Sequence, residues 1–189
     1  MNTPNPELWR EAEQVLAEAD CLHDAAAVQA AYDRIAHKVS RQYTGRNPLI
    51  LCVMIGGLAP TAGITQRLSL PFELDYLHAT RYRGATTGGG LVWKRQPDAR
   101  RIEGRDVLVI DDILDEGHTL VAIRQALEGF APASLKVAVL AEKVHDRRAP
   151  DARAEFIGLQ VEDRYVFGCG MDYKEYWRQL PAIYAVKRQ

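Results

Sequence analysis

Four acidic side chains stand close together in the stretch VLVIDDILDEGHTL, which runs from Val107 to Leu120. They are Asp111, Asp112, Asp115 and Glu116, and they are followed directly by Gly117, His118 and Thr119. Carboxylates this close repel one another, so the stability of a fold does not by itself favour the arrangement. We therefore expect a ligand here whose donor groups or cations offset the repulsion.

The residues after the acids suit a phosphate. A glycine lets the backbone approach closely, a helix N-terminus presents unpaired N–H groups, and Thr119 adds a hydroxyl donor. Asp111 and Asp112 can accept hydrogen bonds from hydroxyls such as those of a ribose, or meet a magnesium ion through water. Together these features describe a ribose 5-phosphate. A solvated acidic turn that caps a helix is the alternative, but the apolar lead-in and the spacing Asp-Asp-x-x-Asp-x-Gly-x-Thr favour the ligand site.

The hydrophobic pattern predicts the elements that must position these residues. Two stripes at helical spacing predict two helices near the N-terminus: Leu8, Ala12, Val15, Ala19 and Leu22, then Val28, Ala31, Tyr32, Ile35 and Val39. Asp24 suits the N-cap of the second helix. The continuous apolar run 49–55 predicts a strand buried on both faces, and a short helix with Pro60 in its first turn follows.

The remaining segments alternate between strand and helix. Strands are predicted at 72–83, 106–110 and 134–143, with weaker candidates at 155–161 and 183–186, and a helix follows the acidic stretch. Residues 91–96 look like the returning arm of a hairpin. This order predicts an α/β fold with a doubly wound, mostly parallel sheet and helices on both faces. Ligands of such folds bind beyond the carboxyl ends of the strands, where both the acids and the sequence IGG at 55–57 lie.

Composition sets further bounds. The chain has 189 residues, 47% of them hydrophobic and 26% charged, as in an ordinary globular domain. The net charge of −1 gives no reason to expect binding to nucleic acid or to a membrane surface. No apolar run approaches the ~20 residues of a membrane-spanning helix. The three scattered cysteines indicate free thiols in a reducing cytoplasm.

Three motifs resemble one enzyme family. VLVIDDILDEGHTL resembles the phosphoribosyl-pyrophosphate signature of type I phosphoribosyltransferases. VMIGGLAPTAGI resembles the pyrophosphate loop of the 6-oxopurine members, and AEK with FIGLQVEDRYVFGCGMDYKEYWRQLPAIYAV resembles their purine-binding C-terminal segment. The resemblance covers roughly 49–186 and is strongest to the bacterial hypoxanthine-guanine enzymes. It implies the type I phosphoribosyltransferase fold in one domain, 1–189, with a small hood and a flexible hairpin lid.

The resemblance also implies how the domain is divided and what it catalyses. Residues 46–189 would form the core and the purine-binding segment, and the helices within 1–45 would form part of the hood or a subunit contact. The enzyme would transfer the 5-phosphoribosyl group from phosphoribosyl pyrophosphate to N9 of hypoxanthine or guanine, giving IMP or GMP. It would use Mg²⁺ and form a homo-oligomer, a dimer or a tetramer.

On the ribose-phosphate side, the resemblance implies a role for each residue of the acidic stretch. Asp111 and Asp112 would hold the ribose hydroxyls, and Asp115 would act at purine N7 as the catalytic acid-base group. The 5′-phosphate loop would consist of Asp115, Glu116, Gly117, His118 and Thr119. His118 stands where many members have lysine or asparagine, a departure that bears on phosphate affinity rather than on the reaction class.

On the purine and pyrophosphate side, the implied residues come from three separate segments. Pyrophosphate would be bound by Ile55, Gly56, Gly57 and Arg178, in a loop where family members often have a non-proline cis peptide; Ile55 stands where some members have lysine. The purine would meet Lys143 at O6, the ring of Tyr165, the backbone of Val166, and Asp172. The implied metal ligands are Asp111, Asp112 and Asp172.

Some alternatives stay open. GATTGGG, after Arg81 and Tyr82, suits a lid that closes over phosphates, although an idle hairpin loop has the same composition. The charged loop KVHDRRAP at 143–150 is predicted to be solvated. A preference for xanthine or adenine is compatible with the same fold. A regulator that senses phosphoribosyl pyrophosphate and binds nucleic acid is disfavoured by the near-neutral charge and by the lack of a basic arm.

Overall fold

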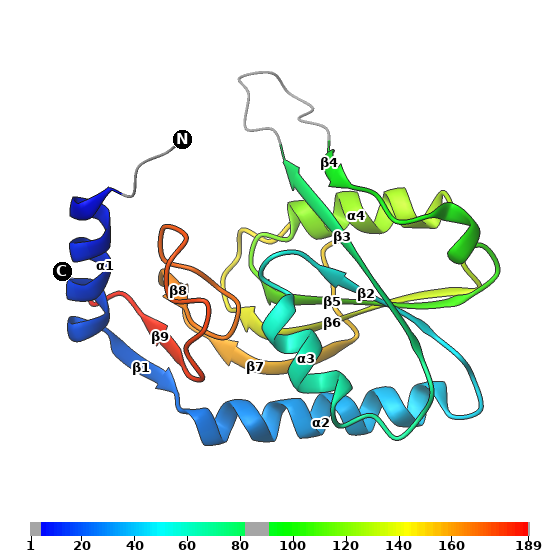
Figure 1. Ribbon diagram of the computed structural model, residues 1–189, viewed down its shortest axis with the longest axis horizontal. Coiled ribbons are helices and arrows are strands. Elements are labelled where there is room, and N and C mark those ends of the chain that lie inside the picture. Colours follow the sequence, from blue (N-terminus) through cyan, green and yellow to red (C-terminus); the bar gives the residue numbers. More distant parts are fainter. Residues whose placement is uncertain (1–4, 82–90, 189) are drawn as a thin grey trace.

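The computed structural model describes residues 5–81 and 91–188. Within those ranges no helix is both long enough and apolar enough to cross a membrane. The chain forms a six-stranded sheet, a smaller three-stranded sheet and helices that pack on both (Figure 1). This is the α/β architecture that the order of elements predicts.

The large sheet has the strand order β4-β3-β2-β5-β6-β7. Its strands are β2 (Leu49–Val53), β3 (Glu73–Arg81), β4 (Leu91–Arg95), β5 (Asp106–Leu114), β6 (Ser134–Lys143) and β7 (Phe156–Val161). All neighbouring pairs are parallel except β3 and β4, which form the predicted antiparallel hairpin. The carboxyl ends of β2, β5 and β6 therefore point the same way, and they carry the IGG segment, the acids and Lys143.

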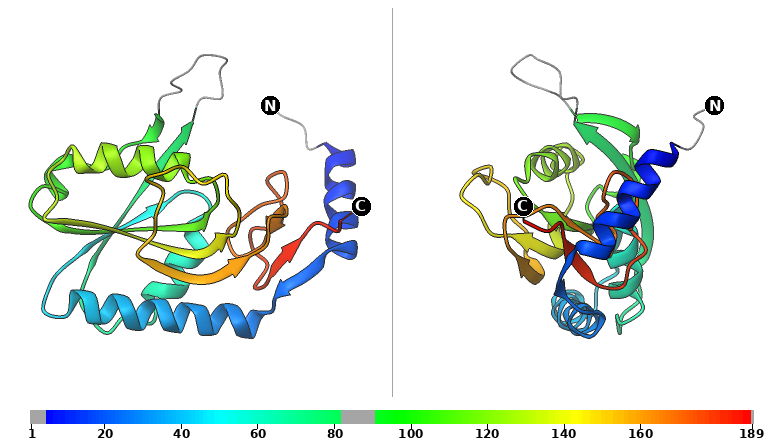
Figure 2. Two further views of the ribbon diagram at one scale, coloured as in Figure 1. Left: turned by 180° about the vertical axis from the view of Figure 1, so that it is seen from behind. Right: turned by 90° about the vertical axis from the view of Figure 1, so that its left-hand side faces the viewer.

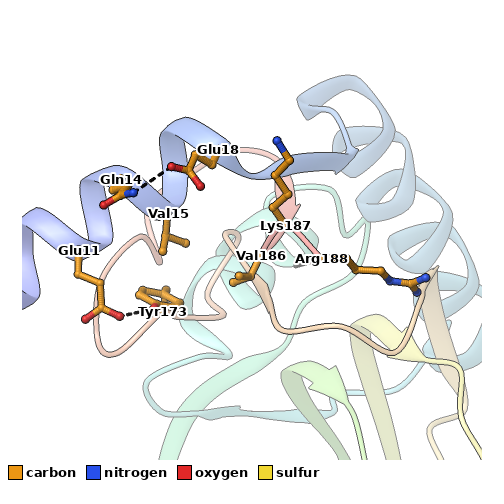
Figure 3. A pocket seen from close by; sticks show the side chains of 8 residues that line it. All are labelled: Glu11, Gln14, Val15, Glu18, Tyr173, Val186, Lys187 and Arg188. Carbon is orange, nitrogen blue, oxygen red and sulfur yellow. Dashed lines mark hydrogen bonds between the residues drawn. The ribbon is translucent and has the colours of Figure 1, made fainter.

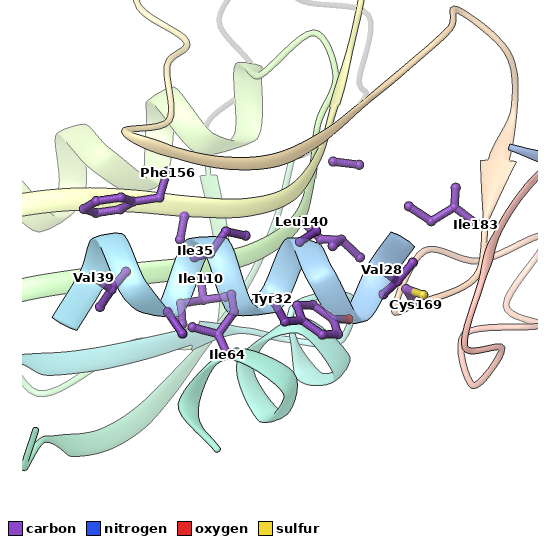
Figure 4. Close-up of a cluster of buried hydrophobic side chains, with 14 of the residues drawn as sticks. Val28, Tyr32, Ile35, Val39, Ile64, Ile110, Leu140, Phe156, Cys169 and Ile183 are labelled. Atoms are coloured by element: carbon purple, nitrogen blue, oxygen red, sulfur yellow. The ribbon is translucent and has the colours of Figure 1, made fainter. Parts of the chain in front are cut away.

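Helices cover both faces of this sheet. α2 (Ala25–Tyr43) and α3 (Leu58–Thr65) pack on one face, and α4 (His118–Glu128) packs on the other (Figure 2). Alternate residues of β5 serve the two cores: Leu108 and Ile110 pack with α2, while Val107 and Val109 pack with α4. Figure 4 shows Tyr32 and Ile35 of α2 in the first of these cores, with the Tyr32 ring on the side of the helix that faces α3. Coverage of both faces explains why these strands read as continuous apolar runs.

The small sheet has the order β1-β9-β8 and joins the two ends of the chain. It consists of β1 (Asp20–His23), β8 (Val166–Phe167) and β9 (Ile183–Ala185), with α1 (Pro6–Glu18) packed beside it. The Trp177 indole donates to the Ala12 carbonyl at 2.7 Å, and the Tyr173 hydroxyl donates to Glu11 at 2.6 Å. We call this unit, α1 with the small sheet and the segment 168–182, the hood.

Several predicted boundaries need correction. The first helix ends at Glu18, not beyond Ala19, because the chain turns extended and Leu22 joins β1, which pairs with the distant β9. The second helix does begin after Asp24, whose side chain accepts from the Ala27 N–H at 2.8 Å. β2 ends at Val53, and the peptide between Met54 and Ile55 is cis.

The strand that leads into the acids is longer than predicted. β5 continues to Leu114, so Asp111 and Asp112 lie within it rather than in the loop after it. The reason is its neighbour: β6 stays paired with β5 from Asp106↔Ser134 to Leu114↔Glu142. A one-turn helix, η1 (Ala99–Arg101), precedes β5.

Candidate active site

A pocket of about 390 Å³ lies between the carboxyl ends of β5 and β6 and the hood. It is lined by Asp112, Ile113, Asp115, Lys143, Tyr165, Val166, Met171 and Asp172. The structure thus brings Asp112, which was predicted to bind ribose, and Asp115 together with all four residues predicted to bind the purine. Met171, which was not among the predicted site residues, is buried beside them.

Asp115 is the centre of a three-residue cluster in this pocket. The Lys143 ammonium donates to its Oδ2 at 2.6 Å, and Nε2 of His145 lies 2.7 Å from its Oδ1. Partial burial raises the pKa of Asp115, but the hydrogen bonds from Lys143 and His145 outweigh it, so the net pKa lies below the usual range. The carboxyl group is therefore ionised at neutral pH, and 41% of the side chain remains exposed to the pocket.

His145 is a residue that sequence reasoning missed. The loop 143–150 was predicted to be solvated, and this is wrong at His145, whose side chain is only 3% exposed. The prediction holds for Arg147, which is half-exposed and pairs with Asp163 at 2.7 Å. One signal was available: His145 follows β6 by two residues, at the edge of the sheet where ligands bind.

Asp111 and Asp112 form a pair of carboxyl groups at the end of the central strand. The Asp112 N–H donates to Asp111 at 2.9 Å, and the Ile113 N–H donates to Asp112 at 2.7 Å. Burial and the neighbouring Asp112 carboxylate raise the pKa of Asp111, and burial also raises the pKa of Asp112. Hydroxyl donors or a cation would stabilise both ionised forms, which is what a ribose or a magnesium ion offers.

The segment after β2 meets the acids and the hood at one crowded point. A Cβ placed on Gly56 would collide with the carboxylate of Asp112. A Cβ on Gly170, whose φ is +105°, would collide with the carbonyl of Gly56. A Cβ on Gly57 would lie 2.6 Å from the Ile110 carbonyl. Only glycines therefore let these three segments touch.

Arg178 lies on the hood side of the same point. Its guanidinium donates to the Gly170 carbonyl at 2.8 Å and lies 2.8 Å from the Asp172 carboxylate. Asp172 also accepts from the Glu175 N–H at 2.7 Å. Arg178 and Asp172, predicted to bind pyrophosphate and to lie near the metal, are thus partners of each other.

The predicted phosphate loop leads into α4. Gly117 has φ +79° and precedes the first helical residue, and a Cβ there would collide with Ala152. The exposed side chains of Glu116 and His118 lie 3.8 Å apart, so His118 adds a polar group at the helix N-terminus. The arrangement offers backbone N–H groups to an anion, as the glycine and helix pattern indicated.

Two predicted features can be placed only in part. Of the predicted lid, Tyr82 and residues 83–90 lie outside the described residues, and Arg81 contributes a backbone pairing with Leu91. In ranges 5–81 and 91–188, no three His, Cys, Asp or Glu side chains group so as to hold a metal. The pair Asp111 and Asp112 nevertheless suits Mg²⁺, which commonly binds one or two carboxylates plus water and substrate phosphates.

A second pocket, of about 460 Å³, lies on the hood between α1 and the C-terminal residues (Figure 3). Its walls include Glu11, which accepts from both Tyr173 and Lys174. None of the predicted site residues lines it. We interpret it as the seam where α1 packs on the C-terminal segment.

Comparisons with known proteins agree on one family. The family model "Phosphoribosyl transferase domain" matches residues 18–175. The chain is 31% identical over 155 residues to a hypoxanthine-guanine phosphoribosyltransferase of Streptococcus thermophilus (strain CNRZ 1066), covering 82% of this chain and 86% of the relative. It is 32% identical over 166 residues to the hypoxanthine-guanine-xanthine phosphoribosyltransferase of Tritrichomonas foetus, covering 88% and 90%. The solved hypoxanthine phosphoribosyltransferase of Trypanosoma cruzi, in complex with the product IMP, has a TM-score of 0.82 at 25% identity, covering 90% and 95%.

Proposed function

The chain belongs to the phosphoribosyl transferase family, and from that premise we propose that it transfers the 5-phosphoribosyl group of phosphoribosyl pyrophosphate to N9 of hypoxanthine or guanine. The products are IMP or GMP and pyrophosphate, so the enzyme returns free purines to nucleotides. One observation carries the proposal. Asp112 of the ribose-phosphate stretch lines the same pocket as Lys143 and Tyr165, and Lys143 bonds Asp115 directly.

The ribose-phosphate half of the substrate fits the end of β5 and the start of α4. Asp111 and Asp112 accept hydrogen bonds from the ribose hydroxyls, which relieves the repulsion between the two carboxylates. The backbone around Gly117 and the Thr119 hydroxyl donate to the 5′-phosphate. Ile55, Gly56, Gly57 and Arg178 bind the pyrophosphate. The support for this binding is the close packing of Gly56 against Asp112, which keeps the pyrophosphate segment beside the ribose acids.

The purine half fits the hood side of the pocket. Tyr165 is half-exposed, and its ring is held edge-on against Tyr173 with centroids 5.4 Å apart, so one face is free to stack on a base. The Lys143 ammonium carries only donors and suits the acceptor O6 of a 6-oxopurine. The backbone of Val166 adds polar groups at the ring edge. Adenine presents an amino donor at the same position and would leave both groups unpaired.

In the reaction, the lone pair of purine N9 forms a bond to ribose C1 while the bond from C1 to the pyrophosphate oxygen breaks and its electrons leave with pyrophosphate. Ionised Asp115 takes or shares the N7 proton, which keeps the base nucleophilic at N9. Positive charge develops on C1 and the ring oxygen, and the carboxylates of Asp111 and Asp112 stabilise it. When bound beside these acids, Mg²⁺ would neutralise charge on the departing pyrophosphate.

A panel of steady-state assays tests this function. The purified protein would be supplied with phosphoribosyl pyrophosphate, Mg²⁺ and, in turn, hypoxanthine, guanine, xanthine and adenine. We expect turnover with hypoxanthine and guanine, and discrimination against adenine by ~10⁴ in kcat/KM. Preference for adenine would overturn the 6-oxopurine assignment. Absence of turnover together with salt-dependent binding of RNA or DNA would support the regulatory alternative instead.

We also propose that the enzyme is a homo-oligomer of the cytoplasm. Leu74 and Tyr76 of β3 and Val92 of β4 are exposed, and their alternation places them on one face of the sheet. Cys21, Cys52 and Cys169 are all free, as in reducing compartments. Sedimentation of the wild type and of a Leu74→Glu variant tests the contact. A wild-type protein that sediments as a monomer would contradict it.

A further inference from the structure

His145 has two hydrogen-bond partners that together fix the position of its ring proton. The backbone N–H of Arg147 lies 3.1 Å from Nδ1, and a backbone N–H can only donate, so Nδ1 carries no proton. The imidazole is therefore the neutral Nε2–H tautomer. Its Nε2, 2.7 Å from Oδ1 of Asp115, is the donor in that contact. The proton on His145 thus points at the carboxylate that is proposed to act at purine N7.

The two donors to Asp115 differ in their access to the pocket and in their alternative partners. Lys143 lines the pocket, and in the proposed function its ammonium also serves purine O6. The side chain of His145 is only 3% exposed and does not line the pocket, so it has no substrate atom to turn to. When Lys143 turns to the base, His145 is the donor that stays with Asp115.

We propose that His145 is a positioning residue that holds the Asp115 carboxylate, ionised and oriented, while Lys143 exchanges Asp115 for the purine oxygen. The proposal rests on the proposed function. The two donors then have different roles. Lys143 recognises the base at O6, and His145 keeps the Asp115 carboxylate ionised and in position to accept a proton. The backbone bond from Arg147 keeps the imidazole in the donating tautomer.

Other charged groups face the cluster and must stay constant in any test. Lys143 comes from β6, Arg147 and Asp163 pair with each other beyond His145, and Glu116 follows Asp115 in the chain. Substitution of His145 alone leaves the side chains of all four unchanged. A change in the behaviour of Asp115 is then attributable to the lost donor.

The direct test observes the cluster in the free protein and needs no turnover. Nitrogen-15 NMR of labelled histidine should show His145 as the neutral Nε2–H tautomer. Carbon-13 carboxyl NMR should show that Asp115 titrates at higher pH in His145→Leu than in the wild type, because a donor to the ionised form is gone. His145→Gln can still donate from its amide and should titrate close to the wild type. His37→Leu, an exposed histidine on α2, is the control and should change nothing.

A second background imitates the state in which Lys143 has turned to the base. In Lys143→Met, Asp115 keeps only the hydrogen bond from His145. Adding His145→Leu to this variant should raise the pKa of Asp115 further. An Asp115 titration that is the same with and without His145, in either background, would overturn the proposal. So would a His145 imidazole that is charged or protonated on Nδ1 at neutral pH.

Steady-state kinetics test whether His145 contributes to turnover. His145→Leu should lower kcat by roughly 10- to 100-fold, the worth of one hydrogen bond to a charged group, with little change in KM for phosphoribosyl pyrophosphate. The acidic limb of the kcat profile should move to higher pH, and His145→Gln should recover most of the activity. An unchanged kcat in His145→Leu would also overturn the proposal. If the wild type turns over no purine, the proposed function fails, while the NMR titrations still decide whether His145 holds Asp115.

Discussion

The ammonium of Lys143 lies 2.6 Å from Oδ2 of Asp115, so the residue proposed to read purine O6 and the residue proposed to act at N7 are direct partners. O6 and N7 are adjacent acceptor or donor positions on one edge of a 6-oxopurine. The ion pair therefore holds the two side chains at a separation that lets both contact that edge of the purine. It also favours the ionised form of Asp115, so recognition and proton transfer share one contact.

Replacement of Asp115 tests the acid-base role. Asp115→Asn keeps the size of the side chain but cannot accept a proton, and we expect kcat to fall by roughly 10²–10⁴. Affinity for phosphoribosyl pyrophosphate, measured by titration calorimetry, should change little. Turnover near the wild-type value would remove Asp115 from the mechanism.

The dependence of activity on pH follows from the same carboxylate. The pKa of Asp115 is lowered, because hydrogen bonds from Lys143 and His145 outweigh the effect of partial burial. The active ionised form is then present above that lowered pKa and is lost as the pH falls through it. We expect protonation of Asp115 to lower kcat only once the pH falls to the ordinary range of an aspartate, ~3.9, or below. An earlier decline would come from Asp111 and Asp112, since burial raises the pKa of both. A decline that begins near neutral pH and is traced to Asp115 would contradict the assignment.

The predicted phosphate loop can be tested at the hydroxyl group of Thr119. Thr119→Val replaces a donor by a methyl group, and a lost hydrogen bond to a charged group costs about 1.5–3 kcal/mol of binding free energy. We expect weaker binding of phosphoribosyl pyrophosphate in calorimetry. Thr44→Val is the control, since Thr44 donates to the Ser40 carbonyl far from the acids. If the Thr119 variant and the wild type bound phosphoribosyl pyrophosphate with equal affinity, Thr119 would not be part of the phosphate site.

Base choice should depend on Lys143. Lys143→Ala removes the donor to O6, so we expect kcat/KM for hypoxanthine and guanine to fall while the dissociation constant of phosphoribosyl pyrophosphate is retained. Because the same ammonium donates to Asp115, the pKa of Asp115 should also rise in this variant. Lys38→Ala, an exposed lysine on α2, serves as the matched control. Wild-type efficiency and selectivity in Lys143→Ala would make Lys143 an ordinary lysine at a strand end.

The contact between the pyrophosphate segment and the acids has no room for a side chain. A methyl group in Gly56→Ala would collide with the Asp112 carboxylate, so one of the two segments must shift. We expect a rise in KM for phosphoribosyl pyrophosphate and a loss of about 1–3 kcal/mol in unfolding free energy. Gly129→Ala, where a Cβ would lie 3.3 Å from the Ala126 carbonyl and 3.8 Å from the Gln125 carbonyl, should have a smaller effect on both. A wild-type KM in Gly56→Ala would show that this packing does not position the site.

The sequence by itself determined the main strands of the large sheet and the position of the acidic stretch at the carboxyl end of one of them. The segment 134–143, with its apolar centre VAVLA, predicts a strand, and the prediction matches β6 residue for residue. The N-cap at Asp24 and the helix after Gly117 also follow from neighbouring residues alone. These features depend on interactions within a few residues, which a local pattern can encode.

Tertiary structure alone decided which residues complete the site. His145 reaches Asp115 across 30 residues only because β5 and β6 pair in register, and no local pattern marks the side chain of His145 as buried within a charged loop. The same pairing extends β5 through Asp111 and Asp112, and the pairing of β1 with β9 ends the first helix early. Gly56, Asp112 and Gly170 meet although they come from three segments. Such contacts depend on the register and packing of distant strands, so their physical cause lies outside the reach of any local pattern.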